Sequence, residues 1–109
     1  MTFKIAKSKV VKVPVTVSVP MDGGRFSTSI FHAQFEILGK QEFEDLSGDD
    51  DRLLMRCTKA VFDVKDENDE PLESNEENIS TLIQIPYVRA AMVTAYVKSA
   101  FGNEGKRKN

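Results

Sequence analysis

Hydrophobic and polar residues alternate over the first third of the chain. Between positions 11 and 19 every second residue is valine, and the positions between hold Lys12, Pro14, Thr16 and Ser18. A period of two predicts a strand with one buried face. Proline has no amide proton to donate to a neighbouring strand, so Pro14 predicts that this strand lies at the edge of a sheet or has that amide position facing solvent.

A hairpin turn and a second strand follow. Asp22-Gly23-Gly24 provides the glycines that a tight turn needs, and residues 26 to 38 form the predicted return strand. Apolar residues occupy even positions up to Ile30 and odd positions from Phe31 onward. This change of phase predicts a bulge or a bend near Ile30, because an extra residue in one strand swaps its faces. The residues then expected to face the core are Phe31, Ala33, Phe35 and Ile37.

Beyond position 39 the hydrophobic period becomes helical. A short helix is predicted over residues 39–46, with Phe43 and Leu46 on one side. Acidic residues at 49–51 then favour the start of a second helix. Its apolar stripe comprises Leu53, Leu54, Cys57, Ala60 and Val61. A short strand over 62–65 and a polar turn over 66–71 are expected after it.

Two further helices are predicted in the last third of the chain. Ser74 and Glu77 have the spacing of a capping box, ahead of a helix whose apolar residues are Ile79, Leu82 and Ile83. Pro86 suits the first position of a last helix, and Gly102 suits its end. The predicted fold is therefore α+β, an N-terminal β-hairpin followed by about four short helices packed on it. Residues 1–102 form one domain, and residues 103–109 form a disordered basic tail.

The distribution of charge along the chain argues against a nucleic-acid partner. The net charge is −2, but residues 42 to 77 carry fourteen acidic against four basic residues. The flanks hold six basic against two acidic residues before this block, and five against one after it. Nucleic-acid binding calls for clustered cations, so a nucleic-acid partner is not expected. No membrane span is expected either, and a single cysteine with no signal-peptide pattern indicates a cytoplasmic protein.

The candidate chemical groups do not add up to an enzyme. Asp66, Asn68, Glu70 and Glu77 have the spacing of a calcium loop, but Pro71 stands where that loop needs glycine. His32 is expected on the outer face of its strand, and Cys57 is expected to be a buried structural thiol. The exposed carboxylates have no apolar pocket to separate their pKa values. We expect no catalytic residue, metal or cofactor.

A protein partner is the remaining expectation. The predicted last helix has apolar residues around much of its circumference, more than a small core is expected to bury. Its aromatic and methionine side chains suit an adaptable binding surface. The predicted partner-binding residues are Tyr87, Val88, Met92 and Tyr96, with Val93 and Val97 beside them.

The order of the motifs resembles the tail assembly chaperones of long-tailed (siphovirus-type) bacteriophages and prophages. The resemblance covers about residues 11 to 101. It starts with the valine strand and Asp22-Gly23-Gly24, and continues through Phe31, Ala33, Phe35 and Leu38, Asp66-Glu67 with Pro71, Ile85 to Ala91, and Ala95-Tyr96. The chain departs from the family in having Val61 and Phe62 where a tryptophan is usual, and in lacking a glycine near Asp69.

The resemblance implies a non-enzymatic chaperone in the host bacterial cytoplasm. Such a protein binds the tape measure protein and helps to recruit tail tube subunits. The alternative is a minor structural tail component, a tube or joining protein retained in the virion. A small nucleic-acid-binding regulator that uses the basic tail is a third hypothesis. The resemblance also implies that some members have a longer frameshifted form. Glu104-Gly105-Lys106 permits a slippery codon series there without requiring one.

Overall fold

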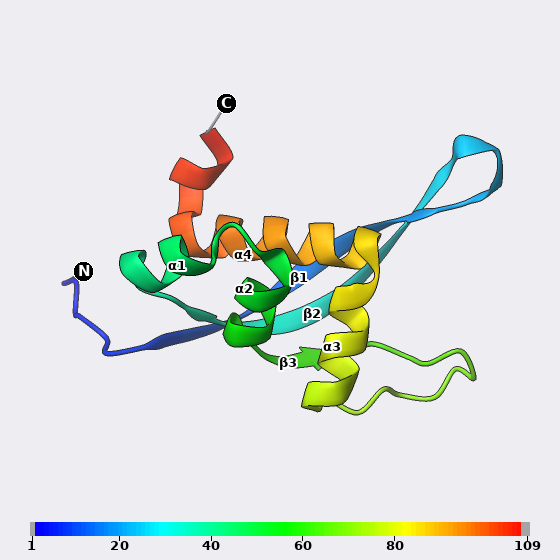
Figure 1. The fold of residues 1–109 in the computed structure, drawn as a ribbon, viewed down its shortest axis with the longest axis horizontal. Coiled ribbons are helices and arrows are strands. Elements are labelled where there is room, and N and C mark those ends of the chain that lie inside the picture. The colour runs from blue at the N-terminus through cyan, green and yellow to red at the C-terminus, as the bar shows by residue number, and fades with distance from the viewer. Residues whose placement is uncertain (1, 108–109) are drawn as a thin grey trace.

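Two long strands, one short strand and four helices make up the described part of the chain. The computed structural model describes residues 2–107, with side chains as far as Gly102. The strands are β1 (Lys9–Pro20), β2 (Phe26–Ile37) and β3 (Thr58–Phe62), and the helices are α1 (Lys40–Leu46), α2 (Asp50–Cys57), α3 (Glu76–Gln84) and α4 (Pro86–Arg107). A 3-10 turn at Asp22–Gly24 joins β1 to β2. The predicted α+β fold with an N-terminal hairpin is confirmed (Figure 1).

The strands form one antiparallel sheet in the order β1-β2-β3. β1 therefore lies at an edge, as Pro14 predicted. Its register with β2 runs from Lys9 opposite Ile37 to Pro20 opposite Phe26 without a shift. The bulge predicted near Ile30 is thus wrong. The irregularity in β2 lies between Gln34 and Phe35, where the strand pairs with β3.

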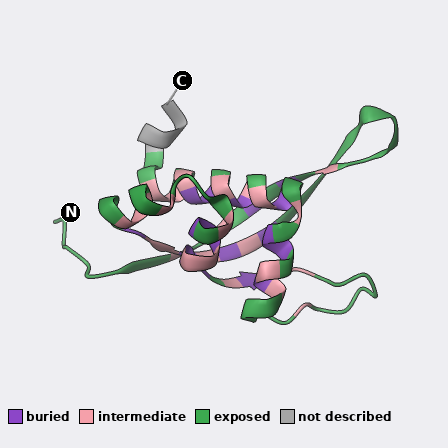
Figure 2. Cartoon of the chain, viewed as in Figure 1, coloured by how far each residue is buried: buried purple, intermediate pink, exposed green. Residues whose placement is uncertain are grey.

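The helices pack on one face of the sheet and close the core. In Figure 2 the buried residues lie between the strands and the helices, and the far end of the hairpin is exposed. α4 packs along β1, and α3 packs against α4 and α2. The sheet contributes Val15, Val17, Phe31, Ala33, Phe35 and Val61 to the core, and the helices contribute Leu53, Leu54, Cys57, Ile79, Leu82, Ile83, Val88, Met92, Ala95 and Tyr96.

Two predicted helix boundaries are wrong for identifiable reasons. α2 ends at Cys57, and Ala60 and Val61 belong to β3 instead, where β-branched residues fit the pleated surface. The residue that caps α3 is Asn75, whose side chain accepts a hydrogen bond from the amide of Asn78. Ser74 does not cap the helix, because its hydroxyl accepts a 2.8 Å hydrogen bond from the Val61 amide in β3.

The last helix begins at Pro86, as predicted. Gly102 interrupts it with φ 57 and ψ −137, a backbone conformation that glycine adopts without strain. Gly102 is therefore a kink within α4, whose printed bounds reach Arg107. The basic tail predicted for 103–109, with its frameshift site at Glu104-Gly105-Lys106, lies outside the residues whose side chains the structure describes.

Candidate protein-binding surfaces

Three of the four predicted partner-binding residues lie in the core. Met92 and Tyr96 are 0% exposed, and Val88 is also buried. The core does not bury all the apolar residues of this helix, because Val93 and Val97 are only partly buried, but it does bury most of the residues predicted to bind a partner. Tyr87 is 38% exposed and is the only one of the four at the surface. A partner cannot contact the other three in this conformation.

Tyr96 instead connects the last helix to the chain between β2 and α1. Its hydroxyl oxygen accepts a buried 3.0 Å hydrogen bond from the Leu38 amide. The ring lies edge-on to Phe35, with centroids 5.7 Å apart, and stacks on Phe43 at 6.0 Å. Burial raises the pKa of the Tyr96 hydroxyl. Tyr96 therefore has a structural role that its place on an apolar helix face did not reveal.

The face of the sheet turned away from the helices carries apolar side chains of its own. We call this the outer face and define its apolar residues as Val10, Phe26, Ile30 and Phe62, which share the even-numbered side of the hairpin or its register partner on β3. Phe26 is 67% exposed and Ile30 is 57% exposed. Phe62 is partly shielded by Lys12, whose ammonium lies 4.3 Å from the ring centroid. Among the described residues, no helix is packed over this face (Figure 1).

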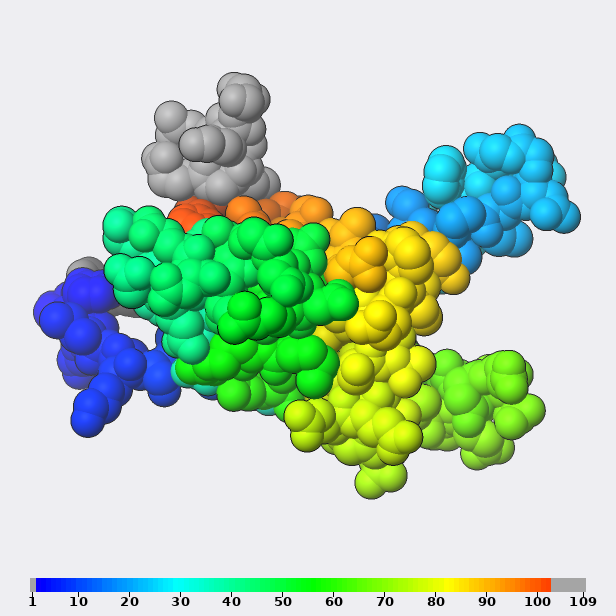
Figure 3. Space-filling model, in the orientation of Figure 1, coloured from blue at the N-terminus to red at the C-terminus, as the bar shows by residue number. Residues whose placement is uncertain are grey.

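The far end of the hairpin extends this surface beyond the body of the molecule. Residues 20–30 are all exposed, although the two strands remain paired as far as Pro20 and Phe26. Figure 3 shows the hairpin tip standing clear of the helices. Met21, at the turn, is 54% exposed. A paired, projecting hairpin with exposed Met and Phe side chains is unusual unless a partner covers it.

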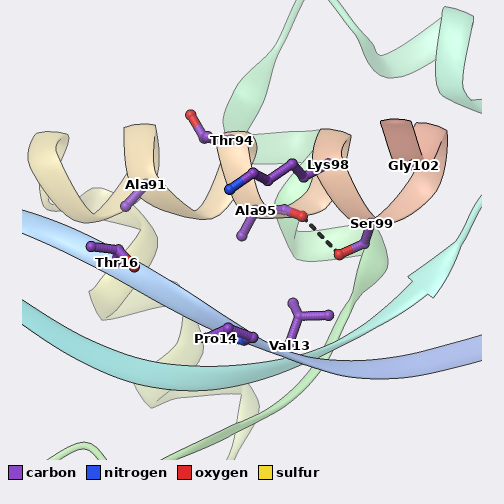
Figure 4. Close-up of a pocket in the computed structure, with 9 residues that line it drawn as sticks. All are labelled: Val13, Pro14, Thr16, Ala91, Thr94, Ala95, Lys98, Ser99 and Gly102. Carbon is purple, nitrogen blue, oxygen red and sulfur yellow. Dashed lines mark hydrogen bonds between the residues drawn. The ribbon is translucent and has the colours of Figure 1, made fainter. Parts of the chain in front are cut away.

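A groove lies between β1 and α4 on the free edge of the sheet. It has a volume of about 410 Å³. Val13, Pro14 and Thr16 line it from the strand, and small residues of α4 line the other side, with Lys98 at the rim (Figure 4). Ser99 does not offer its hydroxyl proton to the groove, because that hydroxyl donates to the Ala95 carbonyl at 2.8 Å.

A cluster of ion pairs holds α1, α2 and β2 together. The Arg56 guanidinium donates to Glu42 at 2.6 Å and to Glu36 at 3.1 Å. Lys59 adds a 3.2 Å contact to Glu36. Hydrogen bonds from these two cations lower the pKa of the Glu36 carboxyl, and the carboxylates raise the pKa of Arg56. Part of the acidic block is thus neutralised within the fold.

The candidate catalytic groups occupy structural positions. His32 lies on the outer face, and its Nδ1 is 2.9 Å from Oδ2 of the exposed Asp63. The Cys57 thiol is buried, and burial raises its pKa to about 12. At that pKa almost no thiolate forms near neutral pH, so Cys57 is a poor nucleophile.

The residues with calcium-loop spacing close a turn. The Asp66 carboxylate accepts hydrogen bonds from the amides of Asn68 at 2.9 Å and Glu70 at 3.0 Å. Asp69 has φ 67, a conformation in which glycine is favoured. This is the place where the resemblance expects a glycine. Within the described part of the chain, no three His, Cys, Asp or Glu side chains are grouped so that they could hold a metal ion.

The chain was compared with protein-family models, curated proteins and solved structures. No family model, no curated protein and no solved structure matches the chain. In the part of the chain that the structure describes, none of the helices has the length and hydrophobicity to cross a membrane.

Proposed function

We propose that this protein is a non-enzymatic chaperone of phage tail assembly, acting in the host bacterial cytoplasm. In this proposal it binds the tape measure protein and helps to recruit tail tube subunits. The order of motifs from the valine strand to Ala95-Tyr96 supports the family. No nucleic acid and no membrane take part in the proposed function.

The outer face and the projecting hairpin are the observation that carries this proposal. Phe26 and Ile30 are exposed on the projecting part of β2, where both faces of the strand are open to solvent. Such exposed apolar side chains cost solubility and add nothing to the core, so they favour a role in binding another protein. We therefore move the proposed partner contact from the last helix to the outer face, with Tyr87 as the residue that remains of the earlier set.

The chemistry of a tape measure protein fits this surface. A long helical protein exposes apolar seams at i, i+3, i+4 and i+7 until its own partners assemble around it. An amphipathic helix lying on the outer face would cover Ile30 and Phe26 and would bury its own seam. Covering the seam prevents aggregation, which is the work of a chaperone.

Co-expression tests the proposed function. The tape measure protein of the phage or prophage that this proposal implies is produced in bacteria with and without the chain, and its soluble fraction is measured. We expect a larger soluble fraction in the presence of the chain, because the seams are covered. An unchanged soluble fraction with the cognate partner would contradict the proposal.

A structural tail component is the second candidate. It is favoured by the long paired hairpin, because β-rich arms also join subunits in stable assemblies. Mass spectrometry of purified particles separates the two functions. A chaperone is absent from the finished particle, and a tube or joining protein is present at a stoichiometric level.

A further inference from the structure

The free edge of β1 has backbone groups that no neighbouring strand uses. Pro14 cannot donate to β2, so its pair with His32 is one in which the amide positions point away from the partner strand. Pairs of this type recur at every second position in an antiparallel ladder. The amides of Lys12 and Thr16 therefore point out of the sheet, toward the free edge.

The pairing of β2 with β3 supports the same direction for the amides of β1. The Val61 amide donates to the Ser74 hydroxyl and not to Ala33, its register partner on β2. The amide of Ala33 is accordingly turned toward β1, where it faces Val13. The backbone hydrogen bonds between β1 and β2 are therefore made by the odd-numbered residues of β1. The backbone amide and carbonyl groups of its even-numbered residues point toward the free edge of the sheet.

The groove of Figure 4 opens along this edge. Val13 belongs to the inner face of the sheet, Pro14 and Thr16 belong to the outer face, and no residue of β2 lines the groove. A cavity that touches both faces of one strand and none of the next lies beside the free edge. Ala91 and Ala95 point toward the strand from α4, and their small side chains leave the space (Figure 4).

The charges around the groove are of one sign. β1 holds Lys9 and Lys12 and no carboxylate, and α4 as far as Gly102 holds Arg89 and Lys98 and no carboxylate. Arg89 is turned to Asp51, 3.8 Å away, and the Lys12 ammonium lies over the Phe62 ring on β3, away from the groove. None of the ion pairs among the described residues uses Lys9 or Lys98. A second copy pairing edge to edge through β1 would bring lysines against lysines.

We propose that the edge of β1 and the groove beside it bind an extended, acidic segment of a partner protein as a fourth strand. The backbone of the added strand bonds to the outward amides of Lys12 and Thr16, and alternate small apolar side chains enter the groove. Its carboxylates lie near Lys98 at the groove and Lys9 on the same strand. This surface borders the outer face, to which Pro14 and Thr16 also belong, and the proposal does not depend on the chaperone function.

A synthetic peptide tests the proposal directly. The probe is a fluorescein-labelled nonapeptide in which glutamate alternates with valine, and its match is the same peptide with lysine in place of glutamate. Fluorescence anisotropy should show binding of the glutamate peptide, weakening as salt is raised, and no binding of the lysine peptide. Equal binding of both peptides, or of neither, would overturn the proposal.

Two variants, each with a matched control, test whether the peptide binds at the β1 edge. Thr16→Pro removes an outward amide and should abolish binding, whereas Thr16→Val keeps the amide and should bind as the unmodified protein does. Lys98→Glu should weaken binding about fivefold, and Lys40→Glu on the remote helix α1 should leave it unchanged. Binding that survives Thr16→Pro in a folded protein would contradict strand addition.

Hydrogen exchange on the unmodified protein keeps the test decisive if a variant fails to fold. The amides of Lys12 and Thr16 should exchange quickly in the free protein and at least tenfold more slowly with the glutamate peptide bound, as for buried ladder amides. Peptide binding without protection of these two amides would overturn the proposal. So would a dimer formed through the β1 edge, detected by sedimentation of the free protein.

Discussion

The two faces of the β1–β2 hairpin share one backbone but differ in how far their apolar side chains are buried. The inner face places Val15, Ala33 and Phe35 at 0% exposure under the helices. The outer face exposes Ile30 and Phe26, which lie on the projecting part of the same strand as Phe35, beyond the helices. The inner face shows what the protein needs to fold. The outer face carries apolar side chains that the core does not use, and these exposed side chains are the basis for proposing a binding function.

The largest predicted effect compares two phenylalanines of β2. Phe35→Ala removes a fully buried ring and should lower the free energy of unfolding by about 3–5 kcal/mol. Phe26→Ala removes an exposed ring and should change it by less than about 0.5 kcal/mol. Urea unfolding followed by circular dichroism measures both. Similar losses for the two variants would mean that the outer face is part of the core.

The next effect concerns the buried hydroxyl of Tyr96. Tyr96→Phe keeps the packed ring but leaves the Leu38 amide without its acceptor, so the free energy of unfolding should fall by about 1–3 kcal/mol. Tyr87→Phe makes the same chemical change at an exposed position and serves as the control. Equal stability of the two variants would show that the Leu38 amide finds another acceptor.

A stabilising change is predicted at Thr58. Its Oγ1 is buried and has no hydrogen-bond partner among the described residues. Thr58→Val keeps the shape and the strand preference while removing a desolvated hydroxyl, so stability should rise by about 1 kcal/mol. Thermal unfolding measures the change. A lower melting temperature would indicate that the hydroxyl is satisfied, for example by a buried water.

The smallest predicted effect at neutral pH is the contribution of the Cys57 thiol to the pH dependence of stability. This contribution becomes larger only at alkaline pH. Burial raises its pKa from 9.0 to about 12 in the folded state. Below pH 9 the thiol is protonated in both states and contributes no pH dependence. Above pH 9 the unfolded state releases the proton first, so stability falls as the pH rises through this window. The loss between pH 8 and 10.5 should be smaller in Cys57→Ala, and an equal loss would contradict the raised pKa.

Local patterns predicted most of the fold, and long-range contacts decided the rest. The valine alternation and the turn at Asp22 were sufficient for the hairpin, and Pro86 was sufficient for the start of α4. The phase change at Ile30 was misinterpreted as a bulge because an apolar residue was assumed to face the core. In the structure Ile30 keeps its register and is exposed.

The candidate binding surface was harder to predict for the same reason. The sequence shows that α4 is apolar on most sides, but not that the long hairpin and α3 cover it. Tyr96 bonds to Leu38, fifty-eight residues away, and no local pattern encodes that contact. Two signals did point to the outer face, because Phe26 and Ile30 occupy the polar phase of an otherwise regular alternation.

The most direct test of the central claim is co-purification of the tape measure protein with outer-face variants. Phe26→Asp and Ile30→Asp, combined in one chain, should leave the circular dichroism spectrum and melting temperature unchanged and should abolish co-purification. Ser27→Asp and Ser29→Asp, combined in one chain, change exposed residues on the opposite face of the same strand; they are the matched control and should retain the partner. Full recovery of the partner with the folded double variant would contradict the assignment of the outer face as the chaperone surface.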